Sequence, residues 1–153
     1  MKIFFSTNYT GSHQNPELVS IGMVDENGRK FYCEANDYVN SEEIQKLVED
    51  FIKPYNIVYF FGKHIYFDWI LLRRIWWREW DIPKNIYDIP FDLCSLFLAE
   101  GIDPATDCEY FAGVIIKPKT STALWDAKVI KECYFRIMPV ESDDKMLFNI
   151  NLN

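Results

Sequence analysis

The sequence predicts an α/β protein in which helices cover a mixed sheet of antiparallel and parallel strands. Asn27-Gly28 lies between two apolar runs, and this dipeptide is the strongest short-range hairpin signal because both residues tolerate positive φ. Asn56 to Phe61 is an apolar run closed by Gly62, as expected for a strand buried on both faces. Hairpins first and helical crossovers later imply a five-stranded mixed sheet flanked by helices.

The N-terminal part is expected to form three antiparallel strands. Lys2 to Asn8 begins apolar and ends polar. Because side chains alternate along a strand, Ser6 and Asn8 point to one side and Thr7 to the other. A polar loop from Thr10 to Pro16 is predicted to follow, and then the strands Glu17 to Val24 and Lys30 to Ala35.

Helices and strands alternate in the rest of the chain. A capping side chain and acidic residues mark a helix start at Asn40-Ser41-Glu42-Glu43, and Pro54 ends that segment. The further predicted elements are a helix from about Ile65 to Trp80, a strand from Ile86 to Phe91, a helix from Asp92 to Glu100 and a last helix from Ser121 to Met138. No element is predicted for the connection from Gly101 to Lys119.

Composition narrows the class of protein. A hydrophobic share of 49% and an aromatic share of 17% exclude a disordered or fibrous chain. The 153 residues predict one domain over residues 1–138 and a tail over 139–153. No apolar run reaches the ~18 residues of a membrane span, and the start lacks a secretion signal, so a soluble, cytoplasmic protein without a membrane partner is expected.

Charge and cysteine usage exclude two further classes. The net charge of −7 argues against a general nucleic-acid coat protein, although it leaves room for a local basic groove. The four cysteines are scattered without a C-x-x-C pair, so they are predicted to be small core residues and not zinc ligands.

Three stretches resemble the DEDDh-type 3′–5′ exonucleases, in particular the small bacterial and phage exoribonucleases related to ribonuclease T. They are Phe4 to Gly11 with the hairpin Val19 to Arg29, then Phe67-Asp68-Trp69, and finally Ser121 to Ala127. They occur in the family's order and span most of the chain. The resemblance implies a ribonuclease H-like fold, with three antiparallel strands followed by parallel ones.

The resemblance also implies where the family's site would lie. The family has an aspartate and a glutamate at the positions of Ser6 and Asn8, and a histidine at that of Ser121. Its chemistry needs two metal ions ~4 Å apart, carboxylates to hold them, and an imidazole as general base. Of the five vestigial positions (Ser6, Asn8, Asp68, Ser121, Asp126), only Asp68 and Asp126 keep the family's residue.

Two functions are consistent with such a degenerate site. The first is binding without cleavage, of a nucleic-acid end, a nucleotide or a protein partner, in a pseudoenzyme that would suit a phage or mobile-element accessory role. No cofactor is expected, and Asp68 with Asp126 would hold Mg²⁺ or Mn²⁺ weakly if at all. The alternative is an active metal-dependent 3′–5′ exoribonuclease that uses these two aspartates, with His64 or His13 as base. Without the resemblance, both aspartates are ordinary solvated or capping helix residues.

The segment from Trp69 to Trp80 has apolar side chains nearly all round a helix, interrupted by arginines. Covering a sheet needs an apolar stripe about a third of the circumference. The apolar and arginine side chains beyond that stripe have the composition of interface hot spots. They predict a homodimer or partner interface formed by Trp69, Arg73, Trp76, Trp77 and Trp80. The other interpretation is a thick core with arginine stems lying along it.

Overall fold

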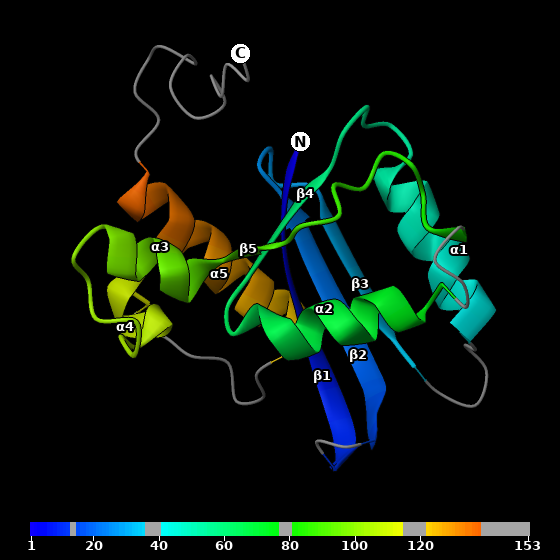
Figure 1. Ribbon diagram of the computed structural model, residues 1–153, viewed down its shortest axis with the longest axis horizontal. Coiled ribbons are helices and arrows are strands. Elements are labelled where there is room, and N and C mark those ends of the chain that lie inside the picture. The colour runs from blue at the N-terminus through cyan, green and yellow to red at the C-terminus, as the bar shows by residue number, and fades with distance from the viewer. Residues whose placement is uncertain (13–14, 36–40, 77–80, 115–121, 139–153) are drawn as a thin grey trace.

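A five-stranded mixed sheet, in the order β3-β2-β1-β4-β5, lies between two groups of helices (Figure 1). The computed structural model describes residues 1–12, 15–35, 41–76, 81–114 and 122–138. The predicted α/β class, with a mixed sheet of five strands flanked by helices, is confirmed.

The sheet begins with β1 (Lys2–Ser12), β2 (Asn15–Asp25) and β3 (Lys30–Glu34), which pair antiparallel in chain order. The predicted polar loop from Thr10 to Pro16 is wrong, because both strands continue through it and Gly11 pairs with Pro16. This end of the hairpin projects beyond the helices (Figure 1). Thr10, Gly11, Asn15 and Glu17 are exposed there, so polar side chains are compatible with strand.

The next elements along the chain are α1 (Ser41–Ile52), β4 (Tyr59–Gly62) and α2 (Ile65–Arg74). The helix predicted from Ile65 to Trp80 is shorter than expected, with Ile75 as its C-cap. The amides of Ile75 and Trp76 donate to carbonyls three residues back, so the last turn tightens into 3₁₀ geometry and the helix ends. Residues 77–80 lie outside the described part of the chain.

The last elements along the chain are β5 (Phe91–Asp92), α3 (Leu93–Ala99), α4 (Cys108–Phe111) and α5 (Ala123–Ile137). The strand predicted from Ile86 to Phe91 is reduced to β5 and an isolated bridge between Val58 and Ile86. Pro90 offers no amide to a ladder, which limits pairing just before β5. The connection for which no element was predicted contains α4, capped by the Asp107 carboxylate.

Each face of the sheet has its own apolar core. Ile3 and Phe5 of β1 pack with α1 and α2, whereas Phe4 packs with α3, α4 and α5. The two cores therefore follow the alternation of side chains along β1. Among the described residues, no helix combines the length and the apolar character that crossing a membrane requires.

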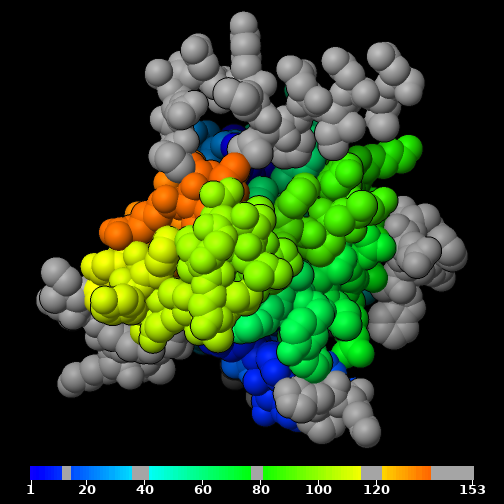
Figure 2. Space-filling model, turned by 60° about the vertical axis from the view of Figure 1, so that its left-hand side comes forward, coloured from blue at the N-terminus to red at the C-terminus, as the bar shows by residue number. Residues whose placement is uncertain are grey.

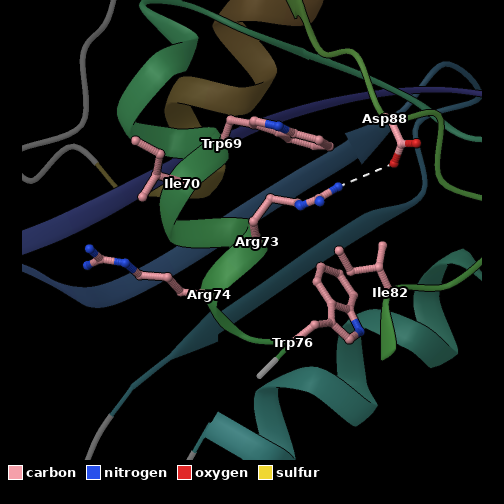
Figure 3. A pocket seen from close by; sticks show the side chains of 7 residues that line it. All are labelled: Trp69, Ile70, Arg73, Arg74, Trp76, Ile82 and Asp88. Atoms are coloured by element: carbon pink, nitrogen blue, oxygen red, sulfur yellow. Dashed lines mark hydrogen bonds and ion pairs between the residues drawn. The ribbon is translucent and has the colours of Figure 1, made fainter. Parts of the chain in front are cut away.

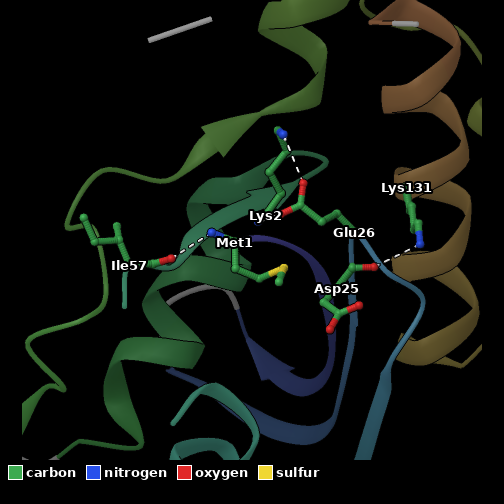
Figure 4. Close-up of polar contacts among 6 residues, drawn as sticks. All are labelled: Met1, Lys2, Asp25, Glu26, Ile57 and Lys131. Carbon is green, nitrogen blue, oxygen red and sulfur yellow. Dashed lines mark hydrogen bonds and ion pairs between the residues drawn. The ribbon is translucent and has the colours of Figure 1, made fainter. Parts of the chain in front are cut away.

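Polar contacts fasten the start of β1 and the turn after β2 to their neighbours (Figure 4). The Met1 amino group donates to the Ile57 carbonyl at 2.9 Å, and Lys2 pairs with Glu26 at 3.1 Å. Lys131 of α5 donates to the Asp25 carbonyl at 3.0 Å. These bonds fix the start of β1, the central strand of the sheet, whose middle carries Ser6 and Asn8.

Candidate functional site

Asp68 is hydrogen-bonded to the edge of β1 beyond the part that pairs with β4. In the described structure β4 pairs with β1 only along Lys2, Ile3 and Phe4. Further along β1, the Thr7 amide donates to Asp68 Oδ1 at 3.0 Å, and the Thr7 hydroxyl donates to the same oxygen. A carboxylate from the first turn of α2 thus takes the place of a neighbouring strand for this backbone donor.

The environment of Asp68 changes its acidity. The residue is only 8% exposed. Loss of hydration disfavours the charged form and raises the pKa of Asp68 to about 6, against the opposing effect of the Thr7 hydrogen bonds. The nearby negative charge of Asp126 raises the pKa of Asp68 further, so the structure brings these two predicted residues within electrostatic reach.

The position of α5 follows from a missing side chain on β2. Gly22 pairs with Ser6 across the β1–β2 ladder. A Cβ at Gly22 would lie 2.1 Å from the Leu124 amide nitrogen, so the first turn of α5 rests directly on the sheet. Asp126 lies in that turn, which places its carboxylate on the same face as Ser6.

Ser6 and Asp126 line a cavity of about 500 Å³ between the middle of β1, the end of β4 and the helices α4 and α5. The lining residues are Ser6, Lys63, Ala105, Asp107, Cys108, Glu109, Asp126, Val129 and Ile130. Figure 2 shows the face on which α3, α4 and the end of α5 gather, with the β1–β2 hairpin projecting below them.

Three charged residues of this cavity were missed by sequence reasoning. Lys63 directly follows β4, and the carboxyl ends of parallel strands are where ligand sites form, so its position was a usable signal. Its ammonium lies 3.4 Å from the Thr106 carbonyl oxygen. Asp107 and Glu109 belong to the connection that had no predicted element. Asp107 caps α4, and Glu109 accepts from the Trp125 indole at 3.0 Å.

Aromatic rings lie next to Asp68. Tyr9 and Phe67 stack with centroids 5.5 Å apart at 26°, and Tyr66 contacts Phe67 at 4.7 Å. Tyr66 is 62% exposed and Tyr9 is 36% exposed, so this aromatic ladder (Tyr9, Phe67, Tyr66) presents ring surface to solvent. A planar ligand can stack on such a surface.

The remaining predicted site and base residues are Asn8, His64, Ser121 and His13. Asn8 is half-buried beside a β-bulge, and bulges change the direction in which neighbouring side chains point. His64 is the N-cap of α2 with a left-handed φ of 52°, and its Nδ1 lies 3.7 Å from the Cys94 sulfur. Ser121 and His13 fall outside the described residues. In the described ranges, no group of three or more histidine, cysteine or acidic side chains is arranged to hold a metal ion.

A separate cavity of about 790 Å³ lies along α2 and the residues that follow it (Figure 3). Its lining residues are Trp69, Ile70, Arg73, Arg74, Trp76, Ile82 and Asp88. Arg73 extends between the two indoles toward Asp88, which it pairs with at 3.3 Å. Trp76 is 3% exposed and donates to Glu49 at 2.9 Å, so its ring packs inside the chain. Trp77 and Trp80 lie outside the described residues, and the interface remains a prediction.

The chain matches no known protein-family model, and no curated protein is significantly similar to it in sequence. The resemblance carried by the three stretches is therefore a hypothesis about this chain, to be weighed with the site geometry.

Proposed function

We propose that this chain is a ribonuclease H-like domain with a degenerate DEDDh site, and that it binds a nucleic-acid end or a nucleotide without cleaving it. The observation that carries the proposal is the proximity of Asp68 and Asp126. They come from stretches far apart in the sequence, both singled out by the resemblance, and their charges interact beside Ser6. The layout of three antiparallel strands followed by parallel ones supports the fold part of the proposal.

The charges of the site argue against cleavage. A two-metal mechanism needs several carboxylates to hold and bridge the ions. Ser6 contributes a neutral hydroxyl to the cavity, and the Asp68 oxygen that accepts both Thr7 bonds is already occupied. With a pKa of about 6, Asp68 is also partly protonated in mildly acidic solution. Two further carboxylates of the cavity are engaged, since Asp107 caps α4 and Glu109 accepts from an indole of α5. Two hard divalent cations would therefore find too few free carboxylates here.

The surroundings fit a short nucleotide ligand. The exposed ladder of Tyr9, Phe67 and Tyr66 offers ring faces for a base, and stacking tolerates any base. Lys63 supplies a positive charge within the neighbouring cavity that can pair with a phosphate. Because the whole chain is acidic, with a net charge of −7, we expect it to hold a short end and not a long stretch of backbone.

Binding of fluorescent mono- and dinucleotides, followed by anisotropy, tests the proposal. Stacking contributes ~1–3 kcal/mol per base, so Tyr66→Ala should weaken binding about fivefold or more without lowering thermal stability. Tyr87→Ala is the matched control, since Tyr87 is also exposed, at 43%, but lies beside the start of the parallel strands at Val58. Absence of nucleotide binding, or equal loss in both variants, would contradict the proposal and favour a protein partner.

The second candidate is an active exonuclease that uses Asp68 and Asp126. The interaction of their charges favours it, since two carboxylates in reach of each other can share one cation. His64 would have to turn away from Cys94 to act as its base. Metal-dependent cleavage by the unchanged protein, abolished by Asp68→Asn, would establish this candidate in place of the first.

A further inference from the structure

Two of the four cysteines are placed against each other at the wall of the Ser6–Asp126 cavity. The Cys133 sulfur, on α5, lies 3.2 Å from the carbonyl oxygen of Cys108, the first residue of α4. Cys133 is fully buried, whereas Cys108 lines the cavity and is 7% exposed. A small reagent in the cavity can therefore reach the Cys108 sulfur first.

The neighbours of Cys108 favour its thiolate form. A hydrogen bond from the Cys133 thiol and the positive charge of Lys63 lower the pKa of Cys108, against the opposing effect of burial. The same hydrogen bond and its own burial raise the pKa of Cys133, so that Cys133 stays a thiol. The pair thus combines a nucleophilic sulfur with a protonated partner beside it, as in other reactive cysteine sites.

We propose that Cys108 and Cys133 form a redox-modification site, at which a hydroperoxide converts the two thiols reversibly into a disulfide. The Cys108 thiolate attacks the terminal peroxide oxygen, the O–O bond breaks and the sulfur is oxidised to a sulfenic acid. The other oxygen leaves as an alkoxide or hydroxide and takes a proton from solvent to become an alcohol or water. The Cys133 sulfur then attacks the Cys108 sulfur. The S–S bond forms, the S–O bond breaks, and the oxygen leaves as water with the Cys133 proton.

The disulfide would join two elements that enclose the cavity. Cys108 and Cys133 are 25 residues apart, and the bond would tie α4 to the middle of α5. Asp107, Cys108 and Glu109 on one side, and Asp126 and Val129 on the other, would then be held at a fixed separation. An effect on ligand binding rests on the proposed function, whereas formation of the bond does not.

Peptide mapping by mass spectrometry tests the site directly. The native protein is treated with hydrogen peroxide, alkylated without reduction and cleaved after lysine, arginine and glutamate. Glu100 separates Cys94 from Cys108, so each cysteine can be followed. We expect a Cys108–Cys133 cross-linked peptide that disappears on adding dithiothreitol. Cys94 is half-buried and is not among the lining residues of the Ser6–Asp126 cavity, so it is the internal control. Oxidation of Cys94 with Cys108 and Cys133 still unlinked would overturn the proposal.

Two further measurements make the result specific. In Cys133→Ala, Cys108 should stop at the sulfenic acid, which a 1,3-diketone reagent traps; no trapping in a folded variant would contradict the mechanism. If that variant does not fold, the native protein is treated with peroxide in urea instead. The cysteines should then pair at random, because the chain is unfolded. A Cys108–Cys133 link that still predominates would show that native geometry does not select it. Nucleotide binding by oxidised and reduced protein then reports regulation separately, since the cross-link can form even where no nucleotide binds.

Discussion

Thr7 and Asp68 are joined by two hydrogen bonds to a single carboxylate oxygen, from the backbone amide and from the side-chain hydroxyl of Thr7. Thr7 points to the face opposite Ser6, so it holds the Asp68 carboxylate from the other side of β1. Asp68 therefore belongs to the α2 side of the sheet and Asp126 to the α5 side. They meet beyond the end of β4, where β1 has an open edge.

Replacing Asp68 by asparagine should change how stability depends on pH. Because the folded-state pKa of Asp68 is raised from 3.8 to about 6, the folded protein binds its proton more tightly than the unfolded chain does. Stability therefore falls as the pH rises through this interval, by at most on the order of 3 kcal/mol. Asp68→Asn keeps an oxygen acceptor for Thr7, so it should remove that fall.

Urea denaturation between pH 3.5 and 7.5 measures this effect. Asp68→Asn and the native protein should have similar free energies of unfolding at the acidic end, with the variant gaining on the native protein above pH 4. Asp50→Asn, at an exposed aspartate of α1, serves as control and should follow the native curve. Parallel curves for Asp68→Asn and the native protein would mean that burial does not control this carboxyl group.

Gly22→Ala should destabilise the fold, because the new methyl group would overlap the backbone of Ala123 and Leu124. Overpacking of this kind costs ~1–3 kcal/mol when the neighbour is rigid. At Gly62 a methyl group would meet side chains alone, Ile65 at 3.0 Å and the Phe5 ring at 3.5 Å, so Gly62→Ala should cost less. Thermal denaturation compares the two variants. Equal losses would show that α5 does not depend on contact with β2 at Gly22.

Trp76→Ala should behave as a core mutation. The ring is 3% exposed within the chain, and removing it leaves a cavity and takes the donor from Glu49. We expect a loss of ~3–5 kcal/mol in the free energy of unfolding, measured by guanidinium titration. Leu98→Ala, at a residue 66% exposed on α3, should change it by about 0.5 kcal/mol or less. Unchanged stability in Trp76→Ala would refute this placement.

The exposed side of α2 remains our prediction for a homodimer interface. Ile70 and the Arg73–Trp69 contact, with the guanidinium 5.7 Å from the ring centre, present apolar and cationic surface together. Light scattering should give twice the mass of one chain. Ile70→Asp should reduce it to one chain, with the circular dichroism spectrum unchanged. A native mass of one chain at micromolar concentration would rule out the homodimer.

Restoring the family's residues tests whether the site is degenerate at the positions named. The triple variant Ser6→Asp, Asn8→Glu, Ser121→His should trim the 3′ end of single-stranded RNA with Mg²⁺ or Mn²⁺, while the native protein should not. The restored carboxylates add the negative charge that two cations need, and the imidazole adds a base. Adding Asp68→Asn to the triple variant is the control and should abolish trimming. An inert triple variant would show that the substrate groove differs as well.

Several parts of the fold could be predicted from local patterns. The Asn27-Gly28 turn and the apolar periods of α1 and α5 identify their elements because backbone preference and burial agree within a short window. The errors fall where that agreement is absent. The end of α2 depends on where Ile75 and Trp76 pack. At the projecting end of the β1–β2 hairpin, polar and turn-forming residues such as Gly11 and Pro16 pair within the ladder, which their residue types do not indicate.

The sequence by itself determined the α/β class, because strand and helix periods are properties of neighbours in the chain. It singled out Asp68 and Asp126 only through the resemblance. Only the tertiary structure decided that these aspartates interact, that Thr7 holds one of them, and that Lys63 and Cys108 share the cavity with Ser6. The reason is physical. These relationships depend on how closely α5 rests on Gly22 and where β4 stops beside β1, and both are set by long-range packing.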